Sequence, residues 1–308
     1  MRTVFMGTPD FAACTLQAMI EAGHEVMAVV TQPDRPQGRK MELKASPVKE
    51  TALKYNIPVY QPEKIRKSDM PELLQKLNPD VIVVVAFGQI LTKEILDIPR
   101  FGCINVHASI LPKYRGAAPI QWAVIDGEEY SGVTTMKMDE GIDTGDILMI
   151  EKYKLAPDET GGSLFDRLAG MGAKLLVRTL EGLEKGTVTP SKQEGTASYA
   201  GKLDKSTGLI DFTKSAAEIE RLVRGLSPWP SAYSYIDGKT VKIWKSHVEN
   251  TDCSRYAPGT VYAVDNAIHV STGDGGLVIT ELQLESKKRM DSEAFLRGYH
   301  LNAGARLG

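Results

Sequence analysis

The stretch Val81-Ile-Val-Val-Val-Ala86 decides the fold of this chain. Every position in it is apolar or small, so both faces of an extended segment are suited to burial. A run that is apolar on both faces is typical of a central strand in a parallel sheet, whereas a strand with one wet face alternates. We therefore expect residues 81–86 at the centre of a parallel sheet.

Working outward from this strand, β-rich runs alternate with segments of helical periodicity. The strands are expected at Val4–Met6, Glu25–Thr31, Cys103–Val106 and Val133–Met138, and the helices at Phe11–Ala22, Pro71–Leu77 and Gly161–Lys185. Gly186 is a natural helix stop. Strand–helix alternation predicts an α/β fold, a doubly wound and mostly parallel sheet of the Rossmann-like kind.

The second half of the chain changes character. Residues 187–205, rich in Gly, Thr, Ser and Lys, predict a linker between a first domain (1–186) and a second (206–308). Ser215-Ala-Ala-Glu218 is a capping box and predicts a helix start, and Asp237-Gly238 predicts a hairpin turn. Several short strands with turns between them indicate a small antiparallel, OB-like β-barrel.

Composition bounds the possible functions. A chain of 308 residues suits two domains, and 42% hydrophobic with 25% charged residues is ordinary for a soluble globular protein. The net charge of −2 gives no long-range attraction to nucleic acid, so such binding would need local basic patches. With no signal peptide and no apolar stretch long enough to cross a bilayer, a cytoplasmic location is expected.

Three cysteines lie far apart in the sequence and form no C-x-x-C pair, so neither a disulfide framework nor a zinc site is expected. Cys14 and Cys103 lie in apolar surroundings and are interpreted as small buried hydrophobes.

Asn105-Val-His107 follows a predicted strand, and Asp143 lies downstream between Gly141 and Gly145. Residues i and i+2 of an extended segment face the same way, and reacting groups in open parallel sheets gather beyond the carboxyl ends of strands. An amide and a protonated imidazole could stabilise the oxyanion of an acyl transfer, at about 3 kcal/mol for each donor. A carboxylate could orient the imidazole and accept a proton from an attacking amine.

The residues alone leave a structural interpretation of this set open. An Asn-x-His pair after a strand is more often structural, and Asp between glycines is common turn chemistry. A nicotinamide dehydrogenase is disfavoured, because the first turn, Gly7-Thr-Pro-Asp10, lacks the G-x-G-x-x-G phosphate cradle.

Several stretches together resemble a known family. Asn105-Val-His-Ala-Ser-Ile-Leu-Pro-Lys-Tyr-Arg-Gly-Ala-Ala-Pro-Ile-Gln121, with Gly141-Ile-Asp-Thr-Gly-Asp146, is similar to the signature of the formyltetrahydrofolate-dependent formyltransferases. The opening Phe5-Met-Gly-Thr-Pro-Asp-Phe11, the loop 31–39 and Leu226-Ser-Pro-Trp-Pro230 resemble the branch that formylates methionine on initiator tRNA. The resemblance covers essentially the whole chain.

The resemblance implies transfer of a formyl group from 10-formyltetrahydrofolate to the α-amine of methionyl-initiator-tRNA, for translation initiation, without a metal. It assigns catalysis to Asn105, His107 and Asp143. Nothing in the sequence demands a dimer, so a monomer is expected. The implied folate contacts are Ser109, Ile110, Leu111, Pro112, Phe87, Gly88 and Gln89, of which the last three have an alternative interpretation as a buried strand end and turn.

Two basic groups are candidates for holding tRNA. They are Arg35, Arg39, Lys40 and Lys44 in a Pro/Gly-rich loop, and Lys287, Lys288 and Arg289 in the second domain. Composition alone favours a solvated loop for the first group. The resemblance instead implies contact with the acceptor end of the tRNA, with Arg39 matching the loop arginine of the family.

Other functions remain to be separated by experiment. Water as acceptor would make the protein a formyltetrahydrofolate hydrolase, and a sugar-nucleotide amine would make it a cell-envelope enzyme. The Gly116-Ala-Ala-Pro119 segment and the basic loop argue against both. A non-catalytic RNA-binding protein would leave the Asn–His–Asp set unexplained.

Overall fold

The computed structural model describes residues 1–37 and 42–308, which form two compact units. Unit 1 comprises Met1–Pro119, Tyr130–Lys154 and Phe165–Ala200. Unit 2 comprises Ile120–Glu129, Leu155–Leu164 and Gly201–Gly308. The predicted domain boundaries at 186 and 206 stay predictions, because each compact unit is made of three separate segments and no single point of the chain divides them.

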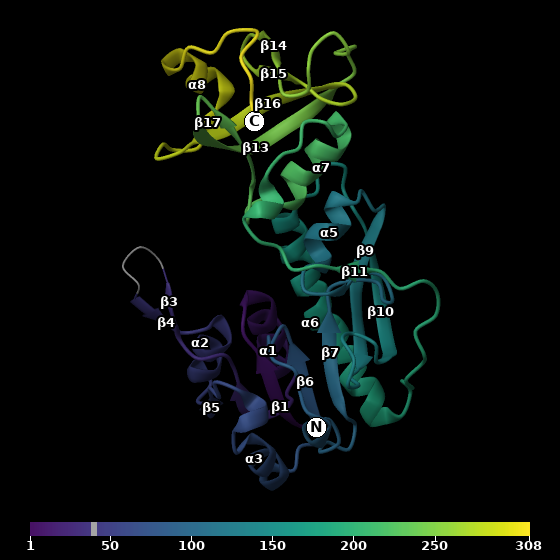
Figure 1. Ribbon diagram of the computed structural model, residues 1–308. Helices are drawn as coiled ribbons and strands as arrows, with labels where there is room; N and C mark the ends of the chain where they lie inside the picture. The colour runs from purple at the N-terminus through teal and green to yellow at the C-terminus, as the bar shows by residue number, and fades with distance from the viewer. Residues whose placement is uncertain (38–41) are drawn as a thin grey trace. The chain divides into compact units, whose positions relative to one another are not determined.

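Within the described residues, unit 1 is built on a seven-stranded sheet of order β10-β9-β7-β6-β1-β2-β5 (Figure 1). The strands β1, β2, β5, β6 and β7 pair in parallel, whereas β9 is antiparallel to both β7 and β10. Their bounds are β1 Arg2–Gly7, β2 Glu25–Val30, β5 Val59–Tyr60, β6 Val81–Val85, β7 Cys103–His107, β9 Tyr130–Lys137 and β10 Asp146–Lys154. The predicted Rossmann-like, mostly parallel sheet is confirmed.

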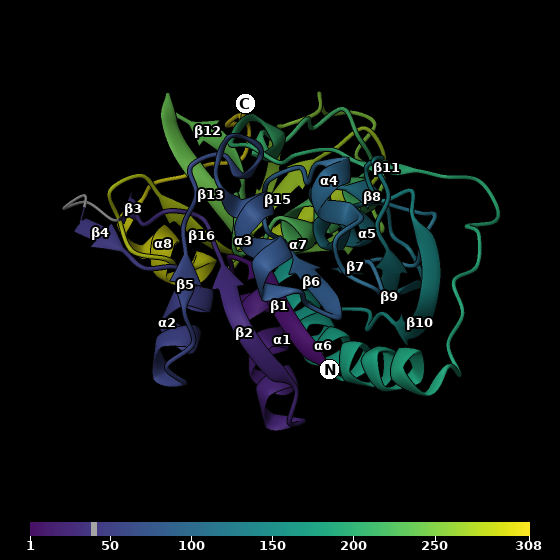
Figure 2. The same ribbon diagram turned by 90° about the horizontal axis from the view of Figure 1, so that it is seen from below.

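The strand β6 lies between β1 and β7, and all five of its residues are buried. Ile82 and Val84 pack into an apolar cluster with residues of α3 (Met70–Leu77) and α4 (Lys93–Leu96). Figure 2 shows α3 and α4 on one side of this sheet and α1 (Asp10–Glu21) and α6 (Gly161–Lys185) on the other. Two covered faces are the physical reason why the sequence of β6 shows no alternation.

Shorter elements complete unit 1. They are α2 (Pro47–Lys54), the 3-10 turn η1 (Ile65–Lys67), and the paired short strands β3 (Arg35–Gln37) with β4 (Glu42–Lys44) and β8 (Arg115–Gly116) with β11 (Tyr199–Ala200).

The expected burial of Cys14 was wrong, because its side chain is exposed. The buried positions of α1 are Phe11, Ala12, Thr15, Leu16 and Met19. This stripe has the spacing of one helix face, and residue 14 falls beside it.

Unit 2 contains, among the described residues, a six-stranded sheet of order β12-β13-β16-β15-β14 with β17 on β16, and these strands pair antiparallel. Its elements are α5 (Pro119–Ile125, from residue 120), the 3-10 turn η2 (Ser206–Gly208), α7 (Ala216–Gly225), β12 Ala232–Ile236, β13 Lys239–Glu249, β14 Val261–Val264, β15 Ile268–Ser271, β16 Gly276–Leu284, β17 Met290–Asp291 and α8 (Ser292–Gly298). This arrangement is consistent with the predicted OB-like barrel.

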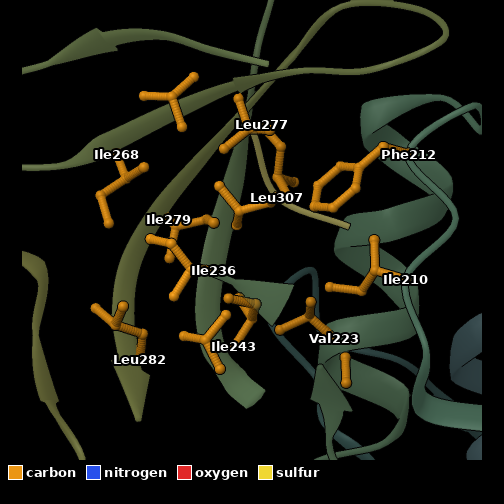
Figure 3. Packing of buried hydrophobic residues seen from close by; sticks show 14 of the residues in the cluster. Ile210, Phe212, Val223, Ile236, Ile243, Ile268, Leu277, Ile279, Leu282 and Leu307 are labelled. Atoms are coloured by element: carbon orange, nitrogen blue, oxygen red, sulfur yellow. The ribbon is translucent and has the colours of Figure 1, made fainter. Parts of the chain in front are cut away.

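One apolar cluster forms the core of unit 2. Figure 3 shows Ile243, Ile279 and Leu282 of the sheet gathered with Val223 of α7, Ile210 and Phe212. The predicted capping box of α7 is present: Ser215 Oγ accepts from the Glu218 N–H at 3.2 Å, and the Glu218 carboxylate accepts from the Ser215 N–H at 3.0 Å. The Ser215 hydroxyl also donates to the Glu218 carboxylate at 2.7 Å, and this bond, together with the one from the Ser215 N–H, lowers the pKa of Glu218.

Within residues 1–37 and 42–308, no helix is both long and apolar enough to cross a membrane.

Candidate active site

The carboxyl end of β7 carries Asn105 and His107, which are 9% and 6% exposed. Alternation along the strand puts them on the same face as Cys103, whose side chain belongs to the cluster beneath α3 and α4. The intervening Val106 faces Gly172 of α6 instead, because a Cβ built on that glycine would lie 3.0 Å from Val106 Cγ1. The expected common direction of Asn105 and His107 follows from this register.

Asp143 belongs to the loop between β9 and β10 and adopts a left-handed backbone conformation, with φ of 53°. The loop is closed on itself by Asp139, whose carboxylate accepts from the Gly141 N–H at 3.0 Å and the Thr144 hydroxyl at 2.6 Å. Aspartate tolerates this backbone region better than most residues, and such strained residues cluster at functional sites.

The structure brings the three predicted catalytic side chains together. Asn105 Nδ2 donates to Asp143 Oδ1 at 3.3 Å, and His107 Nδ1 lies 3.6 Å from Asp143 Oδ2. A third group, the Gly116 N–H, donates to Asp143 Oδ2 at 2.8 Å. The carboxylate is thus fixed from three directions and is itself only 14% exposed.

The second nitrogen of the imidazole determines how the ring can act. His107 Nε2 lies 2.9 Å from the backbone oxygen of Tyr114. A carbonyl only accepts, so Nε2 carries a proton and Nδ1 is left to face Asp143. The Nδ1–Asp143 distance of 3.6 Å exceeds a hydrogen bond, so Nδ1 can exchange a proton with a group that enters beside the carboxylate.

Of the predicted folate residues 109–112, Ser109 and Leu111 form hydrogen bonds within the protein that hold the loop in place. Ser109 Oγ donates to Lys113 O at 2.6 Å. Thr134 Oγ1 donates to Ser109 O at 2.7 Å and accepts from the N–H of Leu111, which is buried, at 3.2 Å. Ile110 and Pro112 are half-buried and keep side-chain surface that a ligand could contact.

Of the predicted folate residues 87–89, two are likewise buried or bonded within the protein and one is exposed. Phe87 is buried in the cluster beneath α3 and α4. Gln89 donates to Pro62 O at 3.1 Å and accepts from the Ile65 N–H at 2.7 Å. Gly88 is exposed with φ of 81°, and the next residue but one, Ile90, is 67% exposed. The exposed positions at this turn are therefore Ala86, Gly88 and Ile90.

The basic candidates lie in separate units. In unit 1, Arg35 and Lys44 are exposed and stand directly opposite each other in the β3–β4 pair, whereas Arg39 and Lys40 fall outside the described residues. In unit 2, Lys287 and Lys288 are exposed after β16. Arg289 is bonded to Glu281 and holds its guanidinium 4.7 Å from the Trp244 ring.

Three supporting residues were missed by sequence reasoning: Tyr114, Gln193 and Ser198. Tyr114 supplies the carbonyl that holds His107, and its own N–H donates to Ser198 Oγ at 2.9 Å. Gln193 and Ser198 lie in the predicted linker, where polar composition indicates solvent and carries no signal of a partner.

No activated thiol stands beside the site among the residues that the structure describes. Cys103, two residues before Asn105, is buried, and burial raises the pKa of its thiol to about 12. It is therefore a thiol at neutral pH and not an activated nucleophile. In the part of the chain that the structure describes, no group of three or more His, Cys, Asp or Glu side chains is arranged to hold a metal ion.

Comparison with known proteins identifies the family. The formyl transferase model matches residues 1–180, and the model of the formyl transferase C-terminal domain matches residues 202–300. The methionyl-tRNA formyltransferase of Lachnospira eligens is 62% identical over 314 aligned residues covering 100% of both chains. That of Agathobacter rectalis is 57% identical over 99% of each.

A solved structure shares the fold. The N-formyltransferase of Helicobacter canadensis, in complex with folinic acid and dTDP-3-aminofucose, superposes with a TM-score of 0.69 at 20% identity, covering 94% of this chain and 99% of that one. This likeness concerns the fold, and the sequence relatives carry the assignment. The chain belongs to the formyl transferase family, among the methionyl-tRNA formyltransferases.

Proposed function

We propose that this chain transfers the formyl group of 10-formyltetrahydrofolate to the α-amino group of methionyl-initiator-tRNA. The observation that carries the proposal is the convergence of Asn105, His107 and Asp143 at one sheet edge, in a chain 62% identical to a methionyl-tRNA formyltransferase over its full length. The folate donor follows from the family, and the related Helicobacter canadensis structure holds folinic acid.

The reaction needs donors for an oxyanion and a path for one proton. The amine nitrogen forms a bond to the formyl carbon, and the carbonyl oxygen takes the negative charge of the tetrahedral intermediate. The bond from this carbon to N10 then breaks, N10 takes a proton, and the former amine loses one. The products are the formamide and tetrahydrofolate.

We assign the oxyanion to Asn105 and His107. An Asn amide has two N–H donors, and Asp143 uses one of them, so the other is available to a formyl oxygen. When Nδ1 of His107 is protonated it is a second donor beside the first. In this mostly buried site each donor is worth about 3 kcal/mol in the transition state.

Asp143 is proposed to accept the proton of the attacking amine, directly or through His107 Nδ1 or a water. Its Oδ2 faces that nitrogen, and the Gly116 N–H keeps the carboxylate from turning away. A free α-amine has a pKa of about 7.7–8.0, so part of it is neutral at working pH and the base need act only as the bond forms.

The tRNA is proposed to be held by basic residues of both units. Arg35 and Lys44 stand directly opposite each other on an exposed strand pair. Like charges at such a position are destabilising unless an anion lies between them, and a phosphate would reverse the sign of the interaction. Arg39 and Lys40, in the same loop, and Lys287, Lys288 and Arg289 complete the proposed set.

One assay tests the function. The purified protein is mixed with labelled 10-formyltetrahydrofolate and one acceptor in turn: charged initiator tRNA, charged elongator tRNA, a dTDP-amino sugar, or water. We expect transfer to charged initiator tRNA well above the other three. Preferred transfer to the sugar nucleotide, or release of formate in the absence of any amine, would assign a different acceptor.

The same assay tests the site. His107→Ala and Asp143→Ala are expected to lower kcat by about two to four orders of magnitude while the protein stays folded, because each removes a proton-transfer or oxyanion group. Normal transfer by either variant would remove the mechanism. We further propose a monomer acting in the bacterial cytoplasm, and light scattering of the purified chain checks the first part.

A further inference from the structure

The segment Ser191–Ala200, called the strap here, is bonded to both loops of the site. At its start, two backbone hydrogen bonds join Ser191 to Ile147. The Ile147 N–H donates to Ser191 O at 2.7 Å, and the Ser191 N–H donates to Ile147 O at 2.9 Å. At its end, β11 pairs with β8, and Ser198 O and Ala200 O accept from the Arg115 and Ala117 N–H groups at 2.9 and 3.0 Å. The strap is therefore held to the start of β10 and to the loop after β7.

Between these ends, Gln193 turns its side chain inward. Its amide nitrogen donates to Asp143 O and to Gly145 O, both at 2.8 Å. Its amide oxygen accepts from Arg115 Nε at 3.1 Å and Nη2 at 2.7 Å. Two donors and two acceptor sites are all that a glutamine amide has, so the group is fully used.

The neighbours of Gln193 differ from it in exposure. Lys192 and Glu194 are exposed, whereas Gln193 is half-buried. Lys192 reaches only the rim of the loop, at Asp146 Oδ1, 2.8 Å away. The side chain of Gln193 thus connects the Asp143 loop with Arg115.

These four hydrogen bonds bear on the contact between Gly116 and the carboxylate of Asp143. Gln193 fixes the backbone carbonyl of Asp143, whose φ of 53° is a conformation that needs support from its surroundings. It also fixes Arg115, and the next N–H in the chain, that of Gly116, is the donor to Asp143 Oδ2. Gln193 therefore holds both partners of that 2.8 Å hydrogen bond in place.

We propose that Gln193 is a positioning residue for Asp143, acting through the backbone of the 143–145 loop and through Arg115. This inference rests on the proposed function, in which Asp143 accepts a proton. Its effect is on the placement of the carboxylate in the transition state and not on the affinity for either substrate.

The kinetic test separates positioning from a structural role. Gln193→Ala is expected to lower kcat about 10- to 100-fold, as removal of a supporting hydrogen bond does at other sites, with KM for both substrates changed less than about threefold. A purely structural role would lower Tm and leave kcat unchanged well below the Tm.

Gln193→Glu is the sharper variant. The carboxylate keeps an oxygen for Arg115 and strengthens that contact, but it has no N–H for Asp143 O and Gly145 O and places an oxygen against them. We expect kcat to fall at least as far as in Gln193→Ala. The matched control is Glu194→Gln, the reverse exchange at the adjacent exposed residue, with kcat within about twofold of the unaltered protein.

A readout without turnover accompanies the kinetics. The ring resonances of His107, assigned by their disappearance in His107→Gln, should shift in Gln193→Glu and stay in place in Glu194→Gln, because the imidazole faces the displaced carboxylate. Unchanged kcat together with unchanged ring resonances in Gln193→Glu would overturn the inference. Absence of formyl transfer by both the unaltered protein and Glu194→Gln would instead contradict the proposed function, and the ring resonances alone would then decide on Gln193.

Discussion

At the scale of single residues, Asp143 combines a chemical and a conformational demand. Its carboxylate faces His107, and its φ of 53° lies in the region that most L-residues avoid. Asparagine satisfies the second demand and not the first, because it tolerates the left-handed region but is no base. The two demands can therefore be separated by substitution.

Asp143→Asn is expected to lower kcat at least about 100-fold with little change in Tm, whereas Asp143→Ala is equally inactive and also less stable by about 1–2 kcal/mol. Single-turnover formyl transfer and thermal unfolding check the pair. An Asn variant that keeps more than a tenth of kcat would show that the carboxylate is not the base.

The cysteines give a second prediction at this scale. Cys14 is exposed, whereas Cys103 and Cys253 are buried. Burial raises the pKa of all three thiols, with Glu21 adding to the effect at Cys14, so the three differ in their access to a reagent. In the folded protein at about pH 8 we expect one thiol, Cys14, to react rapidly with a disulfide reagent, and all three to react in denaturant. Cys14→Ser should abolish the rapid phase, and its persistence would contradict the assignment.

Cys103 also affects stability at alkaline pH. Its pKa of about 12 in the folded state lies above the value of an unfolded thiol, so the unfolded chain loses this proton first. The resulting stabilisation is complete below about pH 8.5 and declines as pH rises toward 12. Cys103→Ala should therefore show a different pH dependence of the unfolding free energy between about pH 9 and 10.5, with a shallower decline, measured in urea. Parallel pH slopes in the two proteins would refute this.

At the scale of elements, the sequence predicts the helices and strands that have a clear local pattern of apolar residues or capping residues. The helix expected over 161–185 has the bounds of α6, and two residues suffice to predict the capping box of α7. Strand alternation alone requires Asn105 and His107 to face one way. These features need no knowledge of a partner.

The strand β10 and the strap escape prediction for the opposite reason. β10 begins with the short apolar run Ile147–Ile150, which periodicity alone does not distinguish from a helical segment, and Glu151–Lys154 then alternates half-buried and exposed positions. The strap is held by hydrogen bonds to backbone carbonyl and N–H groups of segments distant in the sequence. Nearly every residue type carries these backbone groups, so the sequence of the strap does not indicate such bonds. Gln193 therefore falls within a predicted linker.

The contact of β8 with β11 predicts a sensitive glycine. Gly116 has φ of 116°, and a Cβ there would lie 2.7 Å from Ala200 O. Gly116→Ala should cost about 1–3 kcal/mol in unfolding free energy and should also lower kcat, because the Gly116 N–H holds Asp143.

The control is Gly201→Ala, at a position where a Cβ has nothing within 4 Å. It should change stability by less than about 0.5 kcal/mol and leave kcat unaltered. Equal behaviour of the two alanine variants in chemical denaturation and turnover would show that the β8–β11 pairing is dispensable.

At the scale of the whole molecule, a net charge of −2 means that tRNA must be attracted by patches. Replacing both Lys287 and Lys288 by Ala is expected to weaken tRNA binding and to reduce the slope of log K against log salt by about 0.7–0.9 for each phosphate that the variant no longer neutralises. Lys174→Ala, an exposed lysine of α6, is the control. Equal slopes for the double variant and the control, in filter binding from about 50 to 300 mM salt, would remove these lysines from the interface.

The described chain passes from one compact unit to the other five times, at 119/120, 129/130, 154/155, 164/165 and 200/201. Residues 120–129 and 155–164 belong to unit 2, where Arg221 donates to Ile125 O at 3.0 Å and Arg224 donates to Glu159 O at 2.7 Å. A protease that cuts once at the exposed Glu194–Gly195 bond should therefore yield two fragments that co-elute as an intact particle on gel filtration and separate only in urea. Because unit 2 combines residues 201–308 with two earlier segments of the chain, cleavage of one peptide bond does not release it as a separate domain.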